Sequence, residues 1–144
     1  MEELHSVNSA VIWREIGDAD VLSDDRERVI WRVSLPPASA PALIAALTRG
    51  IDVRYFFDWG GGLVWLAVAS EDRLGGNDGG AAAIRAAVAG AGGYATLIRG
   101  AAALRSVVDV FEPQSGALAA LGGRVKASFD PRRVLNPGRM FRDL

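Results

Sequence analysis

The sequence predicts an α+β fold of the ferredoxin-like type, an antiparallel sheet with helices packed on one face. Strand-like and helix-like segments follow the order β-α-β-β-α-β between residues 28 and 99. A short glycine-rich link at residues 59–62 joins two strand-like segments, as in a hairpin. No long repeat, low-complexity tract or linker divides the chain. We therefore expect residues 1–144 to form a single domain, with an irregular tail over residues 129–144.

The first two elements follow from hydrophobic spacing. Apolar residues at helical spacing predict a helix over residues 7–16, ended by Gly17. Apolar and polar residues then alternate over 28–35, which predicts a strand that Pro36 and Pro37 stop. The positions expected to face the core are Val29, Trp31, Val33 and Leu35.

A second helix is predicted over residues 41–47. Ser39 is expected to cap it, Pro41 occupies its first turn, and Gly50 lies just past its end. Strands are then expected over 51–58 and 63–70. The chain between these strands is short enough for a hairpin.

The next part of the chain contains a helix and a strand. An alanine-rich run with Ile84 and Val88 predicts a helix that can pack closely on a sheet and that Gly90 ends. Residues 94–99 predict a short strand. Between 100 and 113 the signal is divided, because 101–105 favours a helix and 107–111 favours a strand.

A last helix is predicted from Ser115 onward. It carries an apolar stripe on one face, and Gly122-Gly123 is expected to interrupt it. The stripe consists of Leu118, Leu121, Val125 and Phe129.

Composition limits the class of protein. Half of the residues are apolar and the formal net charge is −1, which is typical of a globular domain and unlike a strongly nucleic-acid-binding protein. There is no cysteine, no apolar run near the about 18 residues of a membrane span, and no basic signal-like N-terminus. We expect a cytoplasmic protein without a membrane span.

Charge is unevenly placed. Residues 2–28 carry eight acids against three arginines, a net charge of −5, whereas residues 124–144 sum to +4. The simpler interpretation is that both are solvated faces, and the alternative is that the basic end meets an anionic surface or cofactor.

Few groups suggest catalysis or metal binding. The single histidine, His5, cannot build a triad or a metal site alone, and Lys126 lies outside any phosphate-loop motif. Residues 90–95 match a G-x-G-x-x-A string, but they lead from a helix into a strand, the reverse of the dinucleotide-binding order. Two acidic pairs, Asp24-Asp25 and Glu71-Asp72, could hold Mg²⁺ but are better explained as solvated loop charge. We expect no metal site.

Five aromatic residues fall in or beside the strands, and core packing is the expected role. They are Trp31, Tyr55, Phe57, Trp59 and Trp65. The alternative is that they stack RNA bases beside Arg32, Arg54 and Arg99. The mildly acidic chain lacks the glycine-aromatic RNP signature, so we expect no nucleic-acid partner.

The tail is the most unusual stretch. Between Phe129 and Met140, Asp-Pro, Asn-Pro and Gly138 exclude both helix and regular strand and favour turns. We expect a tail with a defined shape and several arginines to contact another domain or molecule.

Several stretches, in order, resemble the C-terminal cap portion of the FAD-binding subunit of bacterial glycolate oxidases, within the FAD-linked oxidases of the vanillyl-alcohol oxidase type. The resemblance spans about residues 11–142. The matching stretches are Trp13-Arg14-Glu15, Trp31-Arg32-Val33-Ser34-Leu35-Pro36-Pro37, Asp58-Trp59-Gly60-Gly61-Gly62-Leu63-Val64-Trp65-Leu66, Gly93-Tyr94-Ala95-Thr96-Leu97 and Phe129-Asp130-Pro131 with Asn136-Pro137-Gly138-Arg139-Met140.

The resemblance implies a flavoprotein that oxidises a small 2-hydroxy acid, glycolate to glyoxylate, with FAD held mainly by an N-terminal domain that this chain lacks. The isolated chain is then expected to be an inactive cap that retains no FAD, and Met1 to follow a missing region. Its expected partners are the FAD-binding domain and other glycolate oxidase subunits. The resemblance also implies cofactor contacts for the tail residues Asn136, Pro137, Gly138 and Arg139. No catalytic residue is assigned.

Two interpretations stay open for the tail and for the chain. Asn136-Pro137-Gly138 could be only a turn, with Arg139 in an interdomain ion pair. A substrate carboxylate could instead meet Arg32, Arg54 or Arg99. The chain itself could be a stand-alone ferredoxin-like module that binds a ligand or partner without flavin.

Overall fold

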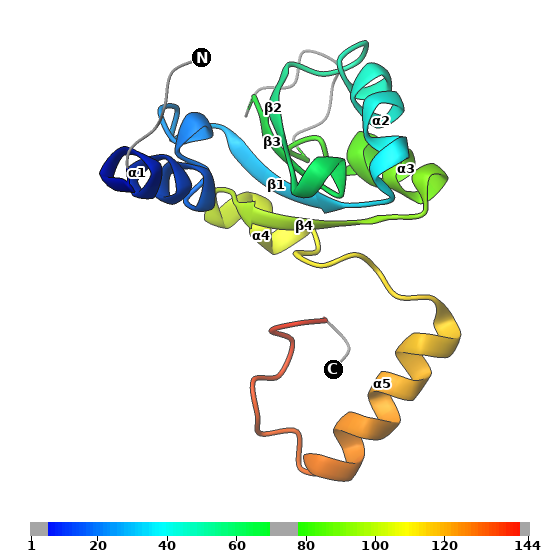
Figure 1. The fold of residues 1–144 in the computed structure, drawn as a ribbon. Helices are drawn as coiled ribbons and strands as arrows, with labels where there is room; N and C mark the ends of the chain where they lie inside the picture. Colours follow the sequence, from blue (N-terminus) through cyan, green and yellow to red (C-terminus); the bar gives the residue numbers. More distant parts are fainter. Residues whose placement is uncertain (1–5, 70–77, 142–144) are drawn as a thin grey trace.

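A computed structural model of the chain describes residues 6–69 and 78–141 (Figure 1). Nine helices and strands lie in these ranges, with three short 3₁₀ turns, η1 (Asp20–Leu22), η2 (Pro37–Ser39) and η3 (Trp59–Gly61). In chain order they are α1 (Ser6–Gly17), β1 (Val29–Ser34), α2 (Ala40–Leu47), β2 (Val53–Asp58), β3 (Leu63–Val68), α3 (Ala81–Ala91), β4 (Tyr94–Arg99), α4 (Ala102–Val107) and α5 (Gly116–Phe129).

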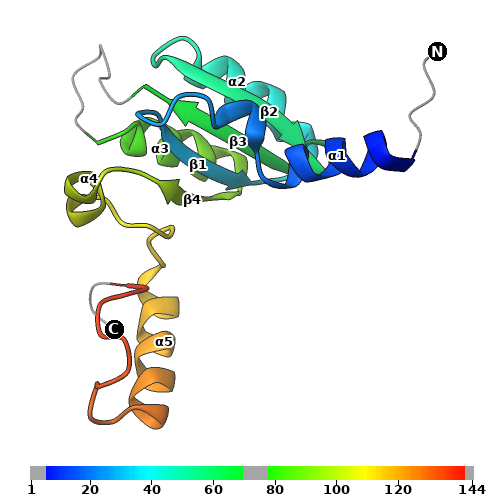
Figure 2. The same ribbon diagram turned by 90° about the vertical axis from the view of Figure 1, so that its left-hand side faces the viewer.

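The four strands form one antiparallel sheet in the order β2-β3-β1-β4. This is the ferredoxin-like arrangement, so the predicted fold class is confirmed. Helices α2 and α3 cover one face of the sheet (Figure 1). Helix α1 lies on the opposite side, which we call the far face (Figure 2).

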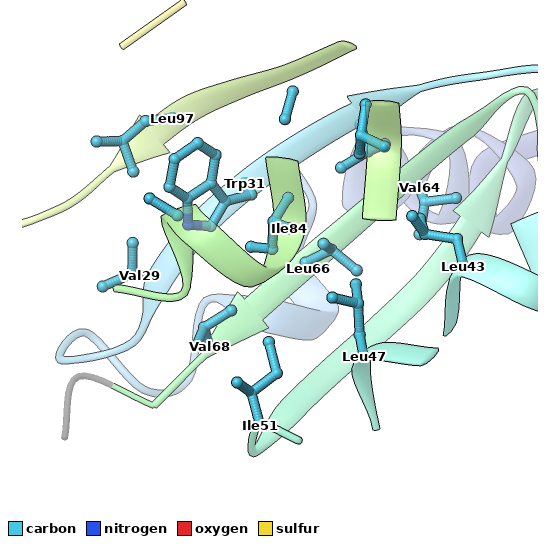
Figure 3. Close-up of a cluster of buried hydrophobic side chains, with 14 of the residues drawn as sticks. Val29, Trp31, Leu43, Leu47, Ile51, Val64, Leu66, Val68, Ile84 and Leu97 are labelled. Atoms are coloured by element: carbon cyan, nitrogen blue, oxygen red, sulfur yellow. The ribbon is translucent and has the colours of Figure 1, made fainter. Parts of the chain in front are cut away.

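The main core lies between the sheet and helices α2 and α3, and Trp31 is its largest fully buried side chain (Figure 3). The Trp31 side chain is fully buried, its indole N–H donates to the Gly79 carbonyl at 2.9 Å, and the Arg85 guanidinium lies 5.6 Å from its ring centroid. Gly79 has φ +61°, and a Cβ there would lie 2.8 Å from Leu104. The left-handed φ and this close contact therefore favour glycine at the residue whose carbonyl accepts the indole N–H.

The strand alternation accounts for this core. Val29, Trp31 and Val33 are buried on the helix-covered side, as predicted. On the far face, Ile30 packs with Ala67 and with Leu22 of η1 in a second, smaller cluster. The sheet is therefore apolar on both sides where α1 and η1 approach it.

Two details of the predicted helix ends are wrong. Ser39 stands at the start of α2, but its side chain makes no capping hydrogen bond and its backbone is already helical. Helix α3 passes Gly90 and ends at Ala91, and the following Gly92 has φ +72° and donates its N–H to the carbonyls of Val88 and Ala89. The left-handed conformation after the last helical residue favours glycine at position 92, whereas Gly90 stays helical inside α3.

Three of the five aromatic residues are not core residues. Tyr55, Phe57 and Trp59 are exposed, whereas Trp31 is buried and Trp65 is half-buried. Strand β2 is an edge strand, so side chains that alternate toward the helix side are only partly covered there. Tyr55 and Phe57 instead pack edge to face, with ring centroids 5.5 Å apart.

Residues 100–113, for which the sequence favoured both a helix and a strand, form helix α4 and then an irregular segment over residues 108–112, which we call the strap. The strap forms no regular strand, but the Leu97 N–H donates to the Val110 carbonyl at 2.8 Å and the Ala95 N–H donates to the Glu112 carboxylate at 3.0 Å. The strap thus satisfies donors on the outer edge of β4.

Helix α5 runs without interruption through Gly122-Gly123, contrary to the sequence prediction. It lies beyond the β4 edge of the sheet, away from α2 and α3 (Figures 1 and 2). None of its residues is buried. The chain returns at Phe141, whose ring lies 6.2 Å from that of Phe111.

Candidate functional site

The tail after α5 is organised by one carboxylate. Asp130 is only 4% exposed and accepts backbone N–H groups of Val134 at 3.0 Å and Leu135 at 2.9 Å. It also pairs with Lys126, one helical turn earlier, at 2.7 Å. The hydrogen bond from Lys126, followed by that from the Leu135 amide, lowers the pKa of Asp130 from 3.8 to about 2. This carboxylate therefore stays charged at neutral pH and holds the turn.

Lys126 also stabilises this turn, because its ammonium donates a hydrogen bond to the Leu135 carbonyl. The backbone reverses at Arg133, Asn136 and Gly138, which have φ of 50°, 46° and 67°. The Arg139 N–H then donates to the Asn136 carbonyl at 3.2 Å. The predicted turn is present, and it is an ordered structure anchored to α5.

A hollow of about 760 Å³ lies between the tail and α5. It is mainly apolar, with a few polar groups at its margin. Its lining residues are Gln114, Gly122, Val125, Lys126, Leu135, Asn136, Arg139, Met140 and Phe141. Such a hollow, with few polar groups, is typical of a ligand or partner site.

The four predicted cofactor contacts lie together at this hollow. Asn136 and Arg139 line it, and Pro137 and Gly138 form the turn between them. All four are exposed. The Arg139 guanidinium makes no ion pair or hydrogen bond with the residues at 6–69 and 78–141, so it is available to a carboxylate or phosphate.

The apolar stripe of α5 lies open in the same part of the molecule. Its four residues range from 47% to 84% exposed, and Val134 is also exposed in the tail. An amphipathic helix normally buries such a stripe. Among the described residues nothing buries this stripe, although Val125 also lines the hollow.

The described acidic pair, Asp24-Asp25, is engaged by arginines. Asp24 accepts two hydrogen bonds from Arg54, at 2.8 and 2.9 Å, which lower the pKa of its carboxyl. Asp25 pairs with Arg28 at 3.3 Å. Glu71-Asp72 and His5 lie outside the described residues. Within residues 6–69 and 78–141 no three His, Cys, Asp or Glu side chains are grouped to hold a metal ion.

The sequence prediction missed the roles of Lys126 and Asp130. Their spacing of four residues places them on the same side of a helix, which was the available signal. The bonds from Asp130 to the later backbone amides need the turn itself and have no sequence signature.

Among the described helices, none combines the length and apolar character needed to cross a membrane. No protein-family model and no solved structure matches the chain. The glycolate oxidase subunit GlcE of Escherichia coli (strain K12) is 29% identical over 133 residues, which is 92% of this chain and 31% of that subunit. The chain thus spans less than a third of its curated relative. Over nearly all of its length, it is similar to one portion of a glycolate oxidase subunit.

Proposed function

We propose that this chain is the C-terminal cap of a cytoplasmic FAD-dependent 2-hydroxy-acid oxidoreductase that converts glycolate to glyoxylate. The observation that carries the proposal is the similarity to the glycolate oxidase subunit over 92% of the chain. The cap is inactive alone and works with an FAD-binding domain and the other subunits of that enzyme. An isolated sheet with its helices is a common fold and supports no function by itself.

The residues of the tail fit one wall of an FAD site. Asn136 and Arg139 line the hollow, and the Arg139 guanidinium is free to pair with an anionic group such as a phosphate. When bound, FAD supplies the oxidation by accepting hydride from the α-carbon of the substrate. The role of this chain is to hold the cofactor and to orient the substrate. Asp130 fixes the turn, and the turn presents Asn136 and Arg139 on one side.

The open face of α5 supports docking of a further domain. A contiguous apolar stripe without a cover is uncommon on a monomer and typical of an interface. Residues 124–144 carry a net charge of +4, which suits a partner surface that holds an anionic cofactor. We assign this stripe to the contact with the FAD-binding domain.

A replacement experiment tests the function. In Escherichia coli cells that lack GlcE, a hybrid subunit is expressed in which this chain replaces the matching portion of the relative. The expected result is glycolate-dependent dye reduction in cell extracts. The control is the same subunit with that portion deleted, which should be inactive. A hybrid that is expressed and keeps its flavin, but reduces no dye with glycolate, would overturn the proposal.

A further inference from the structure

The far face of the sheet brings Arg32, Trp65 and Thr96 side by side. Arg32 on the central strand β1 is paired directly with Trp65 on β3 and with Thr96 on β4. Directly opposite residues of antiparallel strands have Cβ atoms about 4.5–5.5 Å apart and project from the same face. The three side chains therefore form a row across the middle of the sheet.

Arg32 differs from the other arginines at this face. The other three are held by hydrogen bonds, whereas Arg32 is exposed and has no hydrogen bond or ion pair with a described residue. The acceptors are the Asp52 carboxylate for Arg28, the Asp24 carboxylate for Arg54 and the Asp25 carbonyl for Arg99. One guanidinium in the centre of the sheet is therefore available to a ligand.

Trp65 and Thr96 add uncommitted donors beside it. The Trp65 indole N–H is buried and has no acceptor among the described groups, which is uncommon for a buried donor. The Thr96 side chain is 9% exposed and its hydroxyl has no hydrogen-bond partner within the described ranges. Phe56 stacks on the Trp65 ring, with centroids 6.3 Å apart and planes 15° apart, and fixes the indole.

We propose that Arg32 is the anchor of a binding site for a small carboxylate on the far face, with Trp65 and Thr96 as its flanking groups. A guanidinium binds a carboxylate through two parallel N–H bonds, so it favours this ligand over a neutral one of the same shape. No described acid forms an ion pair with Arg32, and Asp24, on the same side of the sheet, is engaged by Arg54. The ligand's identity as a 2-hydroxy acid rests on the proposed function, but carboxylate binding itself does not.

Titration of the ¹⁵N-labelled chain with glycolate, followed by NMR, tests this site. The Trp65→Phe variant identifies the Trp65 indole signal. We expect that signal to shift saturably with glycolate and to stay in place with glycolamide, the neutral analogue. Arg32→Gln should weaken binding at least about tenfold, because a hydrogen bond to a charged group is lost. Arg124→Gln, on α5, removes the same charge elsewhere and should leave binding unchanged.

Absence of a saturable shift at Trp65 would overturn the site, as would equal shifts with glycolamide or equal affinity in Arg32→Gln. Arg32→Lys is a second variant that keeps the positive charge and removes the paired N–H donors. We expect it to bind glycolate more weakly than the unsubstituted chain, because the two parallel hydrogen bonds are lost. The outcome is independent of the hybrid-subunit experiment. If the chain binds the carboxylate but the hybrid subunit does not oxidise glycolate, the proposed function is wrong and the site stands. If the hybrid subunit oxidises glycolate but the chain does not bind the carboxylate, the site is wrong and the proposed function stands.

Discussion

Replacing Phe129 by alanine should separate the stability of this chain from its association with a flavin-binding region. Phe129 ends α5 and is 84% exposed, so its ring contributes little to the folded state of the isolated chain. If the α5 stripe docks as proposed, the same ring becomes buried in the complex. One substitution should then change binding and leave folding nearly unchanged.

The magnitude follows from the area that docking would cover. Burying a phenylalanine side chain contributes about 1.5–3 kcal/mol, and nearly all of this ring is open in the free chain. Truncation to alanine should cost about 2 kcal/mol of binding, which is about thirtyfold in Kd. Unfolding of the isolated variant in urea should stay within about 0.5 kcal/mol of the unsubstituted chain.

The assay is calorimetric titration of the chain with the separately expressed region of GlcE that this chain does not match. The control is Val107→Ala, since Val107 is 67% exposed on α4, outside the stripe, and should alter neither quantity. Equal Kd values for the Phe129 variant and the unsubstituted chain would refute the docking role. A loss of several kcal/mol in the isolated chain would show instead that Phe129 belongs to the fold.

Three further predictions concern the core, the turn and the site. Trp31→Phe removes a buried indole N–H bond and some volume and should cost about 2–4 kcal/mol in urea unfolding followed by circular dichroism, whereas the exposed Trp59→Phe should cost under about 0.5; equal losses would contradict the core assignment. Because the pKa of Asp130 is lowered from 3.8 to about 2, its bonds should stabilise the tail fully above the higher value and be lost as pH falls through the lower one. The protection factors of the Val134 and Leu135 amides, which are corrected for the intrinsic pH dependence of exchange, should fall across that interval, and Asp130→Asn should have low protection even at neutral pH; protection factors that do not change with pH would exclude this role. In the hybrid subunit, replacing Asn136 and Arg139 together by alanine should reduce glycolate-dependent dye reduction at least about tenfold, and an unchanged rate would remove them from the site.

The sheet was predictable because its signals are local. Alternation over 28–35 placed Trp31 in the core, and the short glycine-bearing link between 58 and 63 allowed the hairpin. The exposure of Tyr55 and Phe57 was not predictable in the same way. Their exposure depends on β2 being an edge strand, and strand order is a property of the whole sheet rather than of the segment.

The end of α3 and the environment of α5 show two further limits. Judged from the local sequence, either Gly90 or Gly92 could end helix α3. The helix in fact continues through Gly90, and Gly92 caps it where the chain turns into β4. The α5 stripe was visible in the sequence, but nothing in the sequence states whether its partner lies in the same chain.

The tail was partly predictable. Proline and glycine at 137 and 138 indicated a turn and did form one. The buried bonds of Asp130 to residues 134 and 135, which organise Asn136 and Arg139 around the hollow, arise only when the turn is complete. Their contact with a cofactor remains a prediction.

The central claim, that this chain is the cap of a flavin-dependent 2-hydroxy-acid oxidoreductase, is tested most directly by the spectrum of its flavin. The purified hybrid subunit, assembled with the remaining subunits, is mixed with glycolate without oxygen. The account predicts bleaching of the flavin absorbance with glycolate and none with glycolamide. A flavin that is retained but stays oxidised with glycolate would contradict the account.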